Sequence, residues 1–130
     1  MIATVLAAAM ALQSAQQFDL ACTGSSFSRL QGGRGEAFNV TLRIDLAANR
    51  WCDGDCSAPM AIVSATPDAI VLEDVQPAPR GLNIRRKTEI NRVTGVYDSY
   101  FSAIGSTVQQ GRQEARCEVK PFSGMPQARF

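Results

Sequence analysis

The clearest pattern in this chain is an alternation of apolar and polar residues across positions 38–46. Polar residues occupy positions 39, 41, 43 and 45, and the apolar residues between and around them are Phe38, Val40, Leu42, Ile44 and Leu46. Successive side chains of a strand point to opposite faces of the sheet. The spacing therefore predicts a strand whose apolar face lies in the core.

Two further segments alternate in the same way and carry a cysteine on the apolar face. The first lies near the N-terminus and includes Phe18, Leu20 and Cys22, and the second lies near the C-terminus and includes Ala115, Cys117 and Val119. We expect both segments to be strands that bury their cysteine.

The remaining strand-like runs lie between these segments and are separated by turn signals. The runs cover residues 60–64, 69–73, 83–92, 96–104 and, more weakly, 106–109; we expect loops over residues 24–36 and 75–82. No run has the period of an amphipathic helix. The pattern predicts one all-β domain over residues 16–130, an antiparallel meander of about seven or eight strands curled into a flattened barrel or small sandwich.

The first 12 residues are uncharged and mostly apolar. This length fits the apolar region of a secretory signal and falls short of the roughly 20 residues that a membrane-spanning helix needs. We expect residues 1–15 to be a cleavable leader, cut between residues 11 and 16. The alternative is an Ala-rich N-terminal helix packed on the domain.

The four cysteines favour disulfides, because their number is even and the chain carries an export-like leader. Three pairings are possible. Cys52 and Cys56 flank Asp-Gly-Asp, and Gly54 suits a tight turn between them. Cys22 and Cys117 both face inward on their strands, so we predict the pairs Cys52–Cys56 and Cys22–Cys117.

The composition is that of an ordinary folded domain, with 19 % charged and 45 % hydrophobic residues and a formal net charge of +1. It does not suit a disordered tail or a polybasic nucleic-acid binder. Histidine is absent, which excludes Ser-His-Asp and Cys-His nucleophiles and histidine-ligated zinc. The acids considered for catalysis are Asp53, Asp55, Glu73 and Asp74. The adjacent acids Glu73 and Asp74 would point to opposite faces of a strand. Because the chain also lacks a plausible metal-ligand set, a phosphate loop and a nucleophile with a base, we assign no catalytic, metal or cofactor residue and expect a protein without enzymatic activity.

The only basic run is Arg85-Arg86-Lys87. Alternation places Arg85 and Lys87 outward, where they are candidates for an interaction surface. The same alternation places Arg86 on the inner face. An inward arginine is near a strand end, paired with an acid, or lining a mouth.

Several motifs together resemble a group of small exported bacterial proteins with no assigned function: Cys22-x-Gly24, Trp51-Cys52-x-Gly54-x-Cys56, Arg92-x-Thr94-Gly95 and Cys117-Glu118-x-x-Pro121. The resemblance implies a location in the bacterial envelope and supplies no catalytic residues. A weaker likeness is to exported β-barrel inhibitors of lysozyme, whose Ser-Gly-x-x-Tyr loop enters the enzyme. Here the segment is Thr94-Gly95-Val96-Tyr97, with Thr in place of Ser and one residue fewer before Tyr.

These observations predict a periplasmic or secreted protein with a binding or structural role. The partner is an envelope protein or a small ligand, not a nucleic acid, and the mature chain has no membrane span. The alternative is an inhibitor of a cell-wall-degrading enzyme such as lysozyme. An enzyme should show a pocket with converging acids, a ligand carrier an apolar cavity in the barrel, and an inhibitor an exposed loop over residues 93–97.

Overall fold

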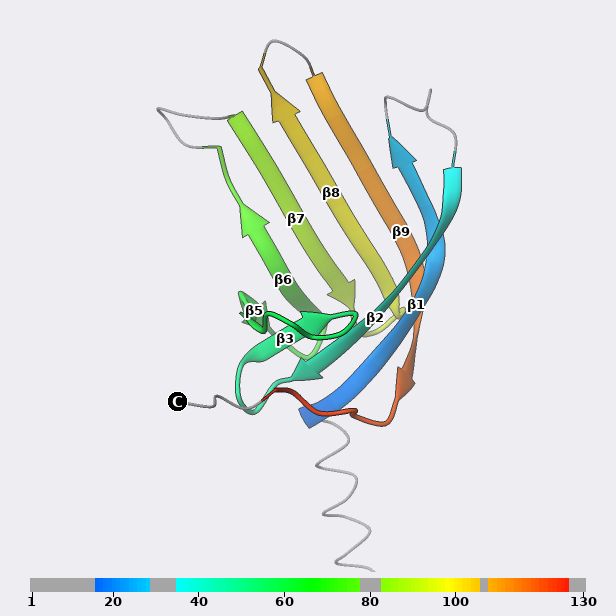
Figure 1. The fold of residues 1–130 in the computed structure, drawn as a ribbon, viewed down its shortest axis with the longest axis vertical. Coiled ribbons are helices and arrows are strands. Elements are labelled where there is room, and N and C mark those ends of the chain that lie inside the picture. Colours follow the sequence, from blue (N-terminus) through cyan, green and yellow to red (C-terminus); the bar gives the residue numbers. More distant parts are fainter. Residues whose placement is uncertain (1–15, 29–34, 78–82, 106–107, 127–130) are drawn as a thin grey trace, which may run out of the picture.

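The computed structural model describes residues 16–28, 35–77, 83–105 and 108–126. Most of these residues form a single antiparallel sheet with the strand order β4-β3-β2-β1-β9-β8-β7-β6-β5 (Figure 1). Its strands are β1 (Gln17–Ser28), β2 (Gly35–Asp45), β3 (Arg50–Asp53), β4 (Met60–Ala61), β5 (Ser64–Ala65), β6 (Ala69–Val75), β7 (Asn83–Asn91), β8 (Val96–Ile104) and β9 (Val108–Lys120). The all-β prediction is confirmed.

The sheet curls into a half-barrel whose two ends differ (Figure 1). At one end, β4 and β5 follow each other closely in the chain, and the segment between them bridges the two edges. The amide of Ile62 donates to the carbonyl of Asn49, and the amide of Val63 donates to the carbonyl of Val71. We call this the closed end.

At the other end the strands diverge, and no segment within the described residues bridges them (Figure 1). β3 pairs with β2 only over Leu42–Asp45, and β5 pairs with β6 only at Ile70 and Val71. Within the described residues, the far halves of β2 and β6 therefore have a neighbouring strand on one side only, and the concave face between them is open. We call this the open end.

The hydrophobic core fills the closed end. Its buried residues are Phe18, Leu20, Cys22, Leu42, Ile44, Trp51, Ile62, Ile70, Leu72, Ile90, Tyr97 and Ala115. The core positions predicted in β2 are confirmed for Leu42 and Ile44, which are 1 % and 0 % exposed, whereas Phe38 and Val40 are partly buried and pack against the core. The difference follows from their place toward the open end.

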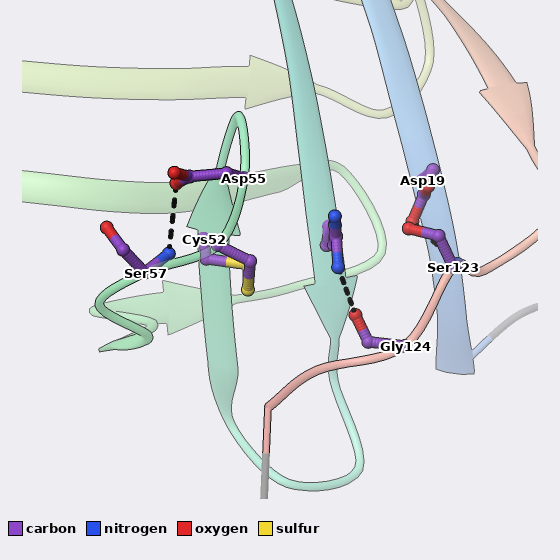
Figure 2. Close-up of a disulfide and its surroundings, with 8 residues drawn as sticks. Asp19, Cys52, Asp55, Ser57, Ser123 and Gly124 are labelled. Carbon is purple, nitrogen blue, oxygen red and sulfur yellow. Dashed lines mark hydrogen bonds between the residues drawn. A yellow bond between two sulfur atoms is a disulfide. The ribbon is translucent and has the colours of Figure 1, made fainter.

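Both predicted disulfides are present. Cys22 and Cys117 are direct partners in the β1–β9 register and have Cα atoms 4.0 Å apart. Cys52 and Cys56 close the turn after β3, with Cα atoms 5.1 Å apart (Figure 2), and Gly54 supplies the positive φ of 55° inside it. Disulfides persist in oxidising compartments, so the two bonds indicate such an environment.

Two expectations of the strand layout are corrected. The described residues form nine strands, not seven or eight. Residues 60–65 contribute two short strands, Arg50–Asp53 form an unexpected strand, and the described part of the weak run at 106–109 belongs to β9. The described parts of the loop expected over 24–36 are strand, since β1 continues to Ser28 and β2 begins at Gly35, and residues 29–34 lie outside the described part. Gly24 serves the sheet itself: a Cβ there would lie 1.9 Å from the carbonyl oxygen of Glu114 in β9.

The segment after β9 crosses the outer face of β1 and β2. The amide of Ser123 donates to the carboxylate of Asp19 at 3.2 Å, and the Arg43 guanidinium donates to the carbonyl of Gly124 at 3.0 Å (Figure 2). Asp19 is thereby buried with a partner. The residues of the expected leader, 1–15, lie outside the described part. Within the described ranges, no helix has the length and apolarity needed to cross a membrane.

Candidate functional site

The concave face of the open end encloses a hollow of about 370 Å³. Residues of seven strands line it: β1, β2, β3, β6, β7, β8 and β9. We call it the open hollow. Its volume lies within the range of roughly 300–1,000 Å³ that small-molecule sites occupy.

The strand registers place five polar residues side by side across the open hollow. Direct pairing links Ser26 to Gln113, Gln113 to Ser99, Ser99 to Thr88, and Thr88 to Glu73. All five line the hollow. We call them the polar row; it runs from β1 to β6 as one continuous layer of the barrel interior.

The layer next to the polar row, toward the closed end, is apolar. It contains Gly24, Ala115, Tyr97, Ile90 and Ile70, each paired with the next. The small residues Gly24 and Ala115 leave room above the sheet, and Phe38 and Tyr97 pack over them with ring centroids 5.7 Å apart. Tyr97 is the member of this layer that lines the open hollow, and together with Val40, Leu42 and Trp51 it forms the floor.

A hydrogen-bond chain fixes the β6 side of the polar row. The hydroxyl of Thr88 donates to the Glu73 carboxylate at 3.4 Å and lies 2.8 Å from the hydroxyl of Ser99. Since Thr88 has one hydroxyl hydrogen, Ser99 is the donor in the second bond. Thr88 is 3 % exposed, so these bonds supply the partners that a buried hydroxyl requires.

Arg86 lies one layer further out, at the mouth of the open hollow. Its Nε is 4.0 Å from Glu73, and its guanidinium lies 5.1 Å from the centroid of the Phe101 ring. The inward arginine is therefore both paired with an acid and lining a mouth. Its side chain is about half exposed, so the ion pair contributes little to stability.

Tyr97 stands where the floor meets the polar row. Burial raises the pKa of its phenol above 10.0; the hydrogen bond with Ser99 lowers this pKa, and the negative charges of Glu73 and Asp53 raise it. The phenol is therefore a neutral group at ordinary pH. All three side chains line the open hollow.

Strand β3 contributes Trp51 and Asp53 to the wall. Pairing with Ile44 and Leu42 puts both side chains on the inner face. Among the described residues, the Asp53 carboxylate has neither a hydrogen-bond donor nor a cation within ion-pair distance. Trp51 is 4 % exposed, and within the same residues its indole N–H has no acceptor.

The residues expected to form an interaction surface are not brought together. Arg85 and Lys87 lie on the convex face, where Lys87 pairs with Glu89 at 3.5 Å. Thr94 and Gly95 lie in the β7–β8 turn at the closed end, and Val96 begins β8. Tyr97 faces inward and is 7 % exposed.

The convex face also carries an ion-pair cluster on β8 and β9. The Arg112 guanidinium donates two hydrogen bonds to Asp98, at 3.2 and 3.0 Å, and lies 2.9 Å from Glu114. These bonds and charges raise the pKa of Arg112. Arg112 therefore has two acids beside it, Asp98 and Glu114.

Sequence reasoning missed the polar row. The signal was present in β7, where the inner positions change along one face from Ile90 to Thr88 and Arg86, and in β8, where Tyr97 is followed by Ser99. In the part of the chain that the structure describes, no three His, Cys, Asp or Glu side chains are grouped as a metal site. Comparisons with protein-family models, curated proteins and solved structures gave no significant match.

Proposed function

We propose that this chain is an exported, non-enzymatic binding protein that holds a small polar ligand in the open hollow. The observation that carries the proposal is the polar row, a continuous layer of hydrogen-bonding side chains on a barrel face whose adjacent layer is apolar core. Polar side chains inside a barrel do not add to the burial of apolar surface that stabilises the fold. Their convergence on a hollow of ligand size is the usual arrangement of a binding site.

The hollow is built to keep its shape. Thr88, Ser99 and Glu73 hold one another by hydrogen bonds, and the floor beneath them is packed core. Such preorganisation favours binding, because little side-chain freedom is lost when a ligand enters. The open side between β2 and β6 supplies a path into the hollow.

The alternative, inhibition of lysozyme through the segment 93–97, has less support. Val93 is 76 % exposed in the β7–β8 turn, but the Tyr97 side chain is buried beneath the hollow. A partner enzyme would meet Val93 and Thr94 without the tyrosine of the inhibitor motif. The geometry therefore favours the hollow over the turn.

Export to the periplasm or the medium is part of the proposal. It is supported by the two disulfides and by the apolar leader over residues 1–15. Mass spectrometry of the protein from its native host should find a chain that begins between residues 12 and 17. An intact Met1 on a cytoplasmic protein would overturn this part.

Retention of small molecules tests the binding role. The oxidised protein is incubated with a small-molecule extract of the cell envelope, purified again and analysed by mass spectrometry of the released compounds. Ser26→Trp fills the hollow from β1, and Ser25→Trp, on the opposite face of the same strand, is the matched control. We expect a compound retained by the wild type and by Ser25→Trp but lost from Ser26→Trp. Equal retention by both variants, or lysozyme inhibition that Ser26→Trp leaves intact without any retained compound, would contradict the proposal.

A further inference from the structure

We infer that the ligand of the open hollow is a neutral, polyhydroxylated molecule, a short saccharide, anchored by the carboxylates of Asp53 and Glu73. The inference rests on the proposed function and names the chemical class of the ligand. It follows from three properties of the lining: its hydrogen-bonding capacity, its charge and the shielding of its aromatic faces.

The hydrogen-bonding capacity calls for a ligand that both donates and accepts. A carboxylate only accepts, and Asp53 has no donor among the described residues. The indole N–H of Trp51 is fully buried in the wall, so the donors that meet a ligand come from the polar row. Ser26 and Gln113 can do both. A ligand rich in hydroxyl groups matches this lining, because a hydroxyl oxygen can both donate and accept a hydrogen bond.

The charge of the lining disfavours anions. Among the described residues, its inward-facing ionised groups are two carboxylates, Asp53 and Glu73, and one guanidinium, Arg86. The second arginine at the rim, Arg112, is held on the convex face by Asp98 and Glu114. The net negative field repels phosphates and uronates, while hydroxyl donors meet the carboxylates without the desolvation cost of a second charge.

The aromatic residues disfavour an organic cation. A cation site needs an open ring face, but Trp51 and Tyr97 are 4 % and 7 % exposed. The Phe101 ring is already covered by Arg86, whose guanidinium also lies beside Glu73. The partly exposed side chains of Phe101 and Phe27, which line the hollow, remain as apolar contacts for the C–H groups of a sugar ring.

The test uses the fluorescence of Trp51, the only tryptophan of the chain, with calorimetry in parallel. The panel contains neutral mono- and disaccharides including N-acetylated ones, the phosphates and uronates of the same sugars, and the amines choline and spermidine. We expect saturable binding of a neutral saccharide, with at least tenfold weaker binding of its charged counterparts.

Matched variants locate the anchors. Asp53→Asn and Glu73→Gln should each weaken saccharide binding about tenfold or more, because each removes a charged hydrogen-bond acceptor. Asp55→Asn, in the same turn but outside the hollow, and Glu89→Gln, on the convex face, should leave it unchanged. Circular dichroism and melting curves show that each variant is folded.

The outcomes separate the ligand class from the binding role. Tighter binding of a phosphate, uronate or amine, lost on Asp53→Asn, would overturn the saccharide class and leave the proposed function in place. Saccharide binding that Asp53→Asn and Glu73→Gln leave unchanged would overturn the assignment to this hollow. Absence of binding by every compound in the panel overturns the saccharide class, and absence of any retained molecule from the envelope extract overturns the proposed function as well.

Discussion

The two ends of this half-barrel are built from the same strands but from different side chains. At the closed end, the inner positions of β1 and β2 are Phe18, Leu20, Leu42 and Ile44, all less than one-tenth exposed. At the open end, the inner faces of the same sheet carry the polar row and Arg86. One end excludes water and closes on itself, and the other keeps a hydrogen-bonded hollow in contact with solvent.

The difference teaches that stability and binding are separated along the strand direction. Apolar burial contributes about 1.5–3 kcal/mol for each fully buried aliphatic or aromatic side chain, and nearly all such residues lie at the closed end. Polar groups that contribute little to stability can then be tolerated at the open end. Substitutions of one kind, made at both ends, should therefore have unequal effects on the free energy of unfolding.

The largest expected effect concerns the two disulfides. Replacing Cys22 and Cys117 by Ser removes a closure across 95 residues, and the chain-entropy model gives a loss of up to about 4.7 kcal/mol. Replacing Cys52 and Cys56 removes a closure across 4 residues, for about 2 kcal/mol. Urea unfolding of the two double variants measures both losses. Equal losses would contradict the prediction that the Cys22–Cys117 bond, which joins β1 and β9, stabilises the fold more than the Cys52–Cys56 bond does.

The next effect compares two isoleucines. Ile44→Ala at the closed end should lower the free energy of unfolding by about 2–5 kcal/mol, because Ile44 is fully buried and leaves a cavity. Ile84→Ala, at the open end of β7, should cost about 1 kcal/mol or less, since Ile84 is only half-buried. Denaturation curves that show similar losses at both sites would remove the distinction between the two ends.

Gly24 tests the close packing of β1 on β9 between the two ends. Gly24→Ala should lower the free energy of unfolding by about 1–3 kcal/mol, because its Cβ meets the Glu114 carbonyl and the backbone of Ala115. Gly105→Ala is the control, since a Cβ there meets nothing within 4 Å. Thermal melts of the two variants give the comparison, and an undisturbed melt for Gly24→Ala would show that the strands can separate freely.

The smallest effect is the pH dependence that Tyr97 adds. Burial raises the pKa of this phenol in the folded state above the unfolded value of 10.0. The neutral phenol's contribution is therefore complete below about pH 10 and is lost as the pH rises toward the folded pKa. Between about pH 9 and about pH 11, the Tyr97→Phe variant should therefore lose less free energy of unfolding than the wild type loses. Melting temperatures at both pH values measure the difference, and parallel declines for wild type and variant would contradict a raised pKa.

The sequence predicted the closed end better than the open end. Strict alternation identified the core face of β2 and placed both cysteines of the Cys22–Cys117 pair inward, because burial enforces the pattern where the core is dry. Gly24 and the serines after it read as a loop, since glycine and serine mark turns in most contexts. Here they belong to strand β1, and Gly24, Ser26 and Ser28 fall on its inner face, where small and polar side chains leave room for the hollow.

The polar row was beyond prediction from one chain for a further reason. Its members come from five strands and meet only through the registers of the sheet, and no single strand carries more than one of them. Arg86 was the one charged residue that the alternation placed on the inner face, and its partner Glu73 was considered only together with its neighbour Asp74 as a catalytic acid. The site could be identified only once the pairing of the strands was known, because that pairing brings these polar residues together.

The most direct test of the binding site is a map of amide shifts on the ¹⁵N-labelled protein as the small-molecule fraction of an envelope extract is added. Binding in the open hollow predicts shifts at Ser26, Thr88, Ser99 and Gln113, with the convex-face amides of Lys87 and Tyr100 unmoved. Shifts confined to the convex face or to the turn at residues 92–95, with the polar row unmoved, would contradict a ligand site in the hollow.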